Sequence, residues 1–177
     1  MKILEGKSIS RNEKPGTMNK KATLILIFGI TILCGCNLSP KAEITDVQKE
    51  RIIKEIELVW KASIEGIEQR DVQKAFKSFS KKGSAKYLRD GYLYESIEAA
   101  KKQYADWFAN SPGKATLTFN PTTHDVLTEE IVITTALGKH VFIDSSDSQR
   151  ITIVGYSIVW QKEEGSWKIL NMHSSIK

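Results

Sequence analysis

The sequence has few of the residues that mark specialised chain types. Only 2 of its 177 residues are cysteine, which excludes a disulfide-rich scaffold. With 4 prolines and 11 glycines, it is neither collagen-like nor of low complexity. It contains no glycine-rich phosphate loop and no G-x-S-x-G nucleophile motif. Its 41% hydrophobic and 27% charged residues are typical of a chain that buries one ordinary core.

Long hydrophobic runs are scarce too, and the main one lies near the N-terminus. Ala22 to Leu33 is apolar over 12 residues, fewer than the roughly 20 that a membrane-spanning helix needs. It follows Lys20 and Lys21, and a basic segment before a short apolar run is typical of a secretory signal. The next residues, Leu33-Cys34-Gly35-Cys36, resemble a bacterial lipobox, which implies cleavage before Cys36 and its lipidation. The alternative is a buried or uncleaved apolar helix.

These features predict three parts: an N-terminal extension with a signal peptide over 1–35, a tether over 36–44 and one domain over 45–177. We expect Met18 to be the true start. Six of the 26 basic and two of the 21 acidic side chains lie in 1–35, so the remainder has a net charge of +1 instead of +5. The one remaining cysteine would carry the lipid, leaving no thiol for a disulfide, a metal or catalysis. The expected location is the bacterial cell envelope, on the periplasmic or extracytoplasmic face of a membrane.

The domain begins with helical patterns. Thr45 and Gln48 fit a capping box that starts a helix running to about Gln69. Asp71 and Ser96 fit the caps of a short second and a third helix, with short strands expected over 85–88 and 92–94 between them. The side chains expected to face inward are Ile53, Ile56, Trp60, Ser63 or Ile64, Ile67, Val72, Ala75, Phe76, Phe79, Ile97, Ala100, Tyr104, Trp107 and Phe108.

The remainder of the domain is predicted to be β. Hydrophobic alternation begins near Ala115 and indicates further strands over 131–143, 151–162 and 166–176, with Gly138 as a bulge or bend. A polar turn over 144–149 and a hairpin at 163–165 connect them. The fold class is therefore α+β: three N-terminal helices packed on a strongly curved antiparallel sheet, a cone-shaped, cystatin-like roll. His124 is expected to lie in a loop.

The last hairpin predicts a register. If Glu163 opposes Ser166, then Tyr156 opposes His173, and alternate side chains face the same side. This places Tyr156, Ile158, Trp160, Ile169, Asn171 and His173 on the inner face. The cavity that they enclose would also include Trp60, Tyr94 and Trp107, and its polar atoms would belong to Tyr156, Asn171 and His173.

The C-terminal segment 157–175 resembles the end of SnoaL-like domains of the nuclear-transport-factor-2-like superfamily. In those domains an apolar strand and a glycine hairpin precede W-K-I-x-x-x-H-x-S, which here is Trp167 to Ser175. Trp60, Arg70-Asp71, Asp90-Gly91 and Ser96-Ile97-Glu98-Ala99 follow the same order upstream, so the likeness spans 45–175. It implies a cone of helices and curved sheet, often dimeric through the sheet. It leaves the activity open, because the superfamily includes isomerases, cyclases, dehydratases, assembly domains and domains without known activity.

Isomerase-like chemistry would need a base and hydrogen-bond donors in an apolar cavity. His173 or Asp90 is the candidate acid or base, and Tyr156 or Tyr94 the candidate donor. No acidic residue is expected on the inner face, because Asp144, Asp147, Glu163 and Glu164 all fall in turns. The favoured interpretation of His173 is therefore a half-buried histidine that hydrogen-bonds Asn171 or Tyr156.

No cofactor or metal is expected. His124, His140 and His173 lie far apart in the sequence and lack metal-ligand spacing. Nucleic-acid binding is not expected either, because the cluster Lys74, Lys77, Lys81, Lys82 and Lys86 is most simply a solvated face.

We therefore expect a non-catalytic, lipid-anchored envelope protein that binds a small apolar ligand in its cavity or mediates protein association, with a homodimer formed through the sheet. The alternative is a small isomerase, cyclase or dehydratase that uses His173. A third possibility is a structural dimer module whose cavity is filled by Trp60, Trp107 and Trp160.

Overall fold

The computed structural model describes residues 43–177. The predicted extension, the signal peptide, Cys36 and most of the tether lie outside them. The described elements are α2 (Asp46–Glu68), α3 (Val72–Phe76), β1 (Lys86–Arg89), β2 (Tyr92–Leu93), α4 (Ile97–Asn110), β3 (Gly113–Thr128), β4 (Ile131–Asp144), β5 (Gln149–Glu163) and β6 (Ser166–Ile176). Within this part of the chain, no helix has both the length and the apolar character needed to cross a bilayer.

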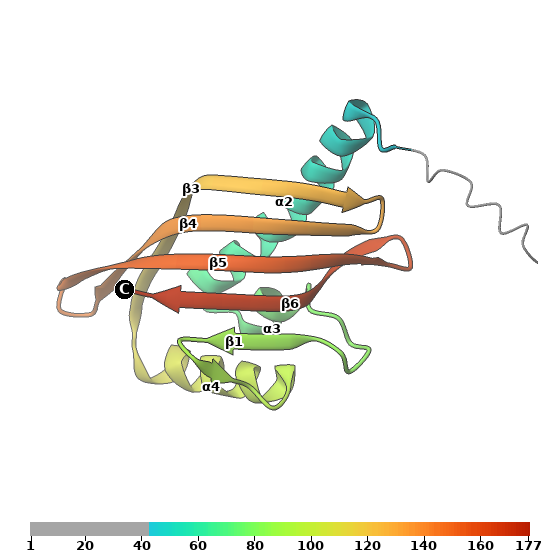
Figure 1. Ribbon diagram of the computed structural model, residues 1–177. Helices are drawn as coiled ribbons and strands as arrows, with labels where there is room; N and C mark the ends of the chain where they lie inside the picture. Colours follow the sequence, from blue (N-terminus) through green and yellow to red (C-terminus); the bar gives the residue numbers. More distant parts are fainter. Residues whose placement is uncertain (1–42) are drawn as a thin grey trace, which may run out of the picture. The chain divides into compact units, whose positions relative to one another are not determined.

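The strands form one sheet with the order β2-β1-β6-β5-β4-β3. Figure 1 shows α2 and α3 on one face of this curved sheet and α4 beside β1. The α+β prediction is confirmed, with one refinement: β1 pairs with β6 in parallel, so the sheet is not wholly antiparallel. This pairing brings Arg89 opposite Ser174, near the end where the cavity opens.

The predicted helix starts are confirmed. The Thr45 and Gln48 side chains form both hydrogen bonds of a capping box, and the Asp71 and Ser96 side chains cap α3 and α4. In the apolar stripe of α2, only the first position was predicted wrongly, because Ile56, Trp60 and Ile67 pack in or against the core as expected. Ile52 is buried at 1% exposure, whereas Ile53 is only partly buried. Ile52 and Ile53 lie four and three residues before Ile56, so helical periodicity allows either side chain to face the core. Packing in the folded protein buries Ile52.

Helices α2 and α3 approach each other closely at Gly66. A Cβ atom at this position would lie 2.3 Å from the backbone nitrogen of Ala75. Only glycine allows this approach, which carries the aromatic side chains of the α3 segment into the core. The largest fully buried side chains are Trp160, Tyr87, Ile52, Ile56, Ile158, Val132 and Thr134.

The prediction of a loop around His124 is wrong. His124 lies in β3, which resumes pairing with β4 after a register shift between Phe119 and Thr122. The irregularity predicted at Gly138 therefore lies on the opposite strand, β3. Gly138 itself keeps regular pairing, and a Cβ atom there would lie 2.4 Å from the Phe119 ring.

Candidate functional site

A bulge in β6 changes which of its side chains face inward. Trp160 opposes Ile169 as predicted, but the next pair is Val159 with Asn171, which leaves Leu170 as an extra residue. One inserted residue moves every later side chain to the opposite face. The predicted pairing of Tyr156 with His173 is therefore wrong, and Tyr156 opposes Ser174.

His173 and Asn171 consequently lie outside the cavity. Both are exposed, and neither lines a described pocket. The interpretation of His173 as a half-buried, hydrogen-bonded residue is also wrong. The bulge instead turns Met172 and Ser174 inward, where Ser174 is 3% exposed.

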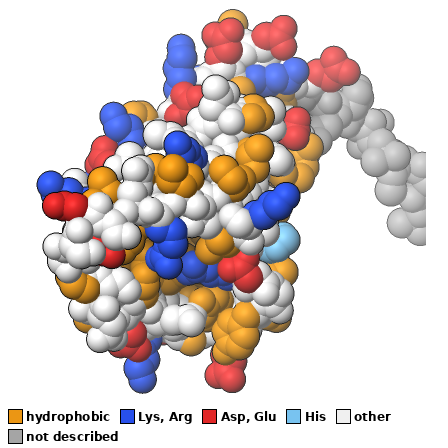
Figure 2. All heavy atoms as spheres, turned by 90° about the vertical axis from the view of Figure 1, so that its left-hand side faces the viewer, with side chains coloured by type: hydrophobic (Ala, Val, Ile, Leu, Met, Phe, Trp, Pro, Cys, Tyr) orange, Lys and Arg blue, Asp and Glu red, His pale blue; other side chains and the backbone are white. Residues whose placement is uncertain are grey.

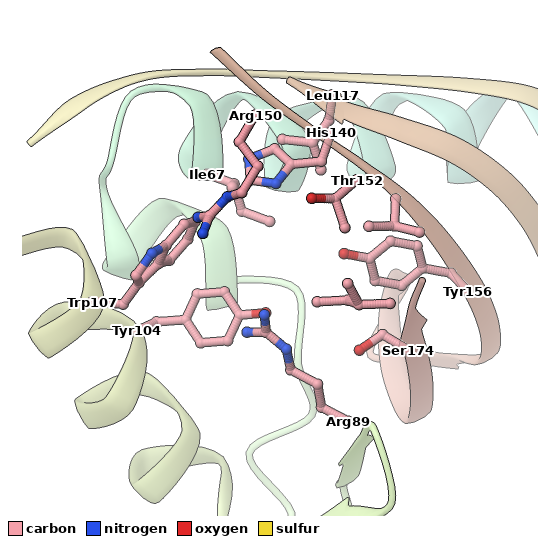
Figure 3. Close-up of a pocket in the computed structure, with 12 residues that line it drawn as sticks. Ile67, Arg89, Tyr104, Trp107, Leu117, His140, Arg150, Thr152, Tyr156 and Ser174 are labelled. Atoms are coloured by element: carbon pink, nitrogen blue, oxygen red, sulfur yellow. The ribbon is translucent and has the colours of Figure 1, made fainter. Parts of the chain in front are cut away.

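The larger of two adjoining cavities inside the cone, the main cavity, has a volume of about 250 Å³. It opens at the end of the molecule that Figure 2 shows, where basic side chains lie in a hollow with hydrophobic side chains around it. Figure 3 shows polar groups from several strands converging on this space, opposite aromatic side chains of α4. Its lining residues are Ile67, Arg89, Tyr104, Trp107, Leu117, His140, Arg150, Thr152, Val154, Tyr156, Ser174 and Ile176.

The charged side chains in this lining are Arg89 and Arg150, and none of the lining residues is acidic. The guanidinium of Arg89 lies 5.3 Å from the centre of the Tyr104 ring, and its Nε is 3.6 Å from a carboxylate oxygen of Asp90. Arg150 lies at the rim, 5.7 Å from the centre of the Phe142 ring. The cavity therefore has a positive electrostatic character.

His140 faces the same cavity from β4. Its ring centre lies 6.0 Å from that of Trp107, and its buried Nε2 makes no hydrogen bond within the described residues. Burial lowers the pKa of His140, and the charges of Arg150 and Arg89 lower it further. The imidazole is therefore neutral at pH 7.

Hydroxyl groups line the inner side of the cavity. The Tyr87 hydroxyl lies 2.7 Å from that of Tyr104 and 3.1 Å from that of Ser174, forming a buried chain. Tyr156 points its hydroxyl into the cavity (Figure 3), and burial raises the pKa of this group. The Tyr156 hydroxyl therefore stays protonated at neutral pH and can donate a hydrogen bond.

A second, smaller pocket adjoins the first and is almost entirely apolar. It has a volume of about 40 Å³ and shares Ile67, Tyr104, Leu117 and Tyr156 with the main cavity. Its other lining residues are Trp60, Ser63, Ile64, Ala75, Phe76, Phe79, Tyr87, Phe119, Ile158, Ile169 and Met172. Together the two spaces have a polar, positive mouth and an apolar interior.

The predicted cavity residues divide into three groups. Trp107 and Tyr156 line the main cavity, and Trp60, Ile158 and Ile169 line the apolar pocket. Trp160 and Tyr94 belong to the core: Trp160 is 0% exposed, and Tyr94 stacks on Tyr87 and hydrogen-bonds Gln103. Asn171 and His173 lie outside. The three tryptophans therefore do not fill the cavity.

Asp90, the other candidate acid or base, has a structural contact. Its carboxylate accepts a hydrogen bond of 2.7 Å from the backbone of Ile176, and it does not line the cavity. Within residues 43–177, no group of three histidine, cysteine, aspartate or glutamate side chains could hold a metal ion.

Arg89, His140 and Arg150 were not predicted as cavity residues. Arg89 lies just after the predicted strand over 85–88, and Arg150 lies just before the predicted start of its strand. His140 was considered only as a metal ligand. Strand alternation could have found two of them, because His140 lies an even number of positions from Val132 and Arg150 from Tyr156.

Comparison with solved structures supports the architecture. A nuclear-transport-factor-2-like superfamily protein from Salmonella enterica serovar Typhimurium aligns with a TM-score of 0.64 and 14% identity, covering 72% of this chain and 92% of its own. A hexachlorocyclohexane dehydrochlorinase from Novosphingobium barchaimii LL02 aligns with a TM-score of 0.63 and 10% identity, covering 75% and 91%. A protein of unknown function from Shewanella oneidensis MR-1 aligns with a TM-score of 0.56 and 14% identity, covering 70% and 98%.

At these identities the likeness concerns the fold alone. Among curated proteins, none matches the chain significantly. The family model for SnoaL-like domains matches residues 56–177, more than half of the chain. That match and the cone-shaped fold agree: the chain belongs to the SnoaL-like domain family, and its fold is similar to that of nuclear-transport-factor-2-like proteins.

Proposed function

We propose that the cone-shaped domain is a binding module that holds a small ligand in its cavity without transforming it. The main support is the cavity of about 250 Å³, which continues into an apolar pocket and which the tryptophans leave open. Such concave, largely apolar sites with a few converging polar groups are typical of small-molecule sites. The family includes binding proteins and enzymes, so membership does not choose between them.

Filling the cavity tests this proposal. Thr152 lines it, whereas Thr116 is exposed on the outer side of β3. We expect Thr152→Trp to abolish retention of a co-purifying small molecule, and Thr116→Trp to leave retention unchanged. Native mass spectrometry of the purified full chain measures this. If the wild-type protein carries no such molecule and binds no small probe, or if both variants retain it equally, the proposal is wrong.

Acid–base catalysis is the second candidate, of the isomerase, cyclase or dehydratase type. The supporting observation is His140, whose imidazole lines the cavity and has a pKa lowered by burial. However, no acidic side chain lines the cavity to orient the ring or to stabilise its protonated form. We therefore favour binding, and turnover of a bound ligand that His140→Gln abolishes would reverse this preference.

We also propose that the domain is held at the extracytoplasmic face of a bacterial membrane by lipid on Cys36. The proposal is supported by the basic residues, the short apolar run and the Leu-x-Gly-Cys sequence before the domain. Cys36→Ser should shift the protein from the membrane to the soluble fraction. Cys34→Ser is the matched control and should leave membrane attachment unchanged. Membrane association of the Cys36 variant would refute the anchor.

A further inference from the structure

The cavity has an excess of positive charge that the described residues only partly offset. Arg89 has one carboxylate nearby, Asp90, at 3.6 Å. Arg150 makes no salt bridge within residues 43–177, and its contact is with the face of Phe142. Two guanidinium groups and one carboxylate leave a net charge of about +1 beside the opening.

This arrangement selects the charge of a ligand. A neutral apolar molecule would remove water from both guanidinium groups without supplying acceptors, which is unfavourable. A carboxylate instead matches the fork of donors that an arginine presents and can accept two hydrogen bonds from it. A single negative charge balances the net charge, whereas a doubly charged phosphate exceeds it.

The aromatic side chains of the cavity wall determine which uncharged group of a ligand fits there. Trp107 and Tyr104 come from α4, with ring centres 5.9 Å apart, and Tyr156 lies across the cavity from them (Figure 3). Aromatic rings favour edge-to-face or offset contact with another ring. Pockets of roughly 300–1,000 Å³ hold drug-sized ligands, so a cavity of about 250 Å³ suits a smaller molecule such as one ring with a small substituent.

We infer that the cavity binds a small aromatic monocarboxylate, with its carboxylate between Arg89 and Arg150 and its ring against Trp107 and Tyr104. His140 also lines the cavity and supplies a further hydrogen-bonding group beside the two arginines. The apolar pocket takes a ring substituent beyond Tyr104 and Tyr156. This inference rests on the proposed binding function and adds the chemical class of the ligand.

Isothermal titration calorimetry of the full chain in detergent, with benzoate as the probe, tests the inference. Benzamide has nearly the same shape without the charge, cyclohexanecarboxylate keeps the charge without the aromatic ring, and phenyl phosphate carries more charge. We expect benzoate to bind at least about tenfold more tightly than benzamide, as for loss of one charge-assisted hydrogen bond, and more tightly than the other two probes.

Variants locate the carboxylate. Arg89→Gln and Arg150→Gln should each weaken benzoate binding by about tenfold or more. Lys139→Gln is the matched control, because Lys139 precedes His140 on β4 but is exposed and absent from the cavity lining. Arg150 is exposed at the rim, so its variant is expected to fold, and circular dichroism verifies this for each protein. Arg150→Lys should restore part of the lost affinity, because it keeps the charge and loses the fork.

Several results would overturn the inference while leaving the proposed function intact. These are equal binding of benzamide and benzoate, tighter binding of phenyl phosphate, equal binding of cyclohexanecarboxylate, or benzoate affinity unchanged in both arginine variants. Failure of benzoate to bind, with a co-purified molecule still lost in Thr152→Trp, also refutes only the ligand class. If no probe binds and no molecule co-purifies, the proposed function fails as well.

Discussion

Thr134 of β4 joins two other side chains in the interior, and replacing it tests the contribution of this polar contact. Its hydroxyl oxygen accepts a hydrogen bond of 2.8 Å from Trp160 Nε1 and lies 2.8 Å from Nδ1 of His124. An indole N–H can only donate, so the threonine hydrogen is free to bond His124. Thr134 and Trp160 are both 0% exposed, so solvent cannot replace either partner.

Thr134→Val keeps the shape of the side chain and removes its hydroxyl. The buried Trp160 N–H loses its acceptor, at a cost of about 1–3 kcal/mol. The lost bond to the partly buried His124 adds about 0.5–1.5 kcal/mol, so we expect the free energy of unfolding to fall by about 1.5–4.5 kcal/mol. Thr134→Ser keeps both hydrogen bonds and loses one methyl group, which costs about 1 kcal/mol.

Urea denaturation followed by circular dichroism measures these differences. The neighbouring Thr135 is exposed, so Thr135→Val is the control and should change stability by less than about 0.5 kcal/mol. The reasoning predicts the order wild type, then Ser, then Val at position 134. A Val variant as stable as the wild type would show that the hydroxyl contributes no net stability.

Three further predictions follow from other parts of the domain. Gly66→Ala should destabilise the protein by about 1–2 kcal/mol in urea denaturation, because a clash with the α3 backbone outweighs the helix propensity gained. Burial is the main cause that lowers the pKa values of His124 and His140, so the unfolded chain takes up these protons first. Stability measured against pH should therefore fall as the pH drops below about 6.5, a loss that His140→Gln reduces, and should show no histidine contribution above about 7.5. If a second copy packs on the exposed outer face of the sheet, Ile153→Lys should convert a dimer into a monomer in analytical ultracentrifugation; a monomeric wild type would refute this association.

The features that the sequence predicted well are local ones. The caps at Thr45, Asp71 and Ser96 depend on a side chain and a backbone group three residues away, so a short stretch of sequence specifies them. The hairpin at 163–166 is local as well, and its first pairs were predicted correctly. By contrast, whether Ile52 or Ile53 is buried in the core depends on packing between distant elements, which no local pattern specifies.

The cavity-lining side chains were harder to predict, because assigning each side chain to a face of the sheet requires regular alternation along the strand with no inserted residue. No glycine or proline marks the bulge at Leu170, and one extra residue was enough to exchange His173 for Ser174 on the inner face. Predictions on β5 were unaffected because the extra residue lies in β6, so Tyr156 and Ile158 face inward as expected. The error is therefore confined to the part of β6 beyond Leu170.

A charged side chain at an inward position is a more robust signal of a site than a histidine near a strand end. Assigning side chains to a sheet face by alternation fails at a bulge. A cationic side chain among apolar inward positions must nevertheless lie in a cavity or at its mouth, because burying the charge in a packed core would cost too much free energy. Arg150 satisfies this condition, two positions before Thr152 and six before Tyr156 on the same strand. Arg89, from the parallel strand β1, reaches the same cavity by a pairing with β6 that no hairpin predicts. The positive character of the site thus comes from residues separated by about a third of the chain, and it is the tertiary pairing of β1 with β6 that turns two separate arginines into one candidate anion site.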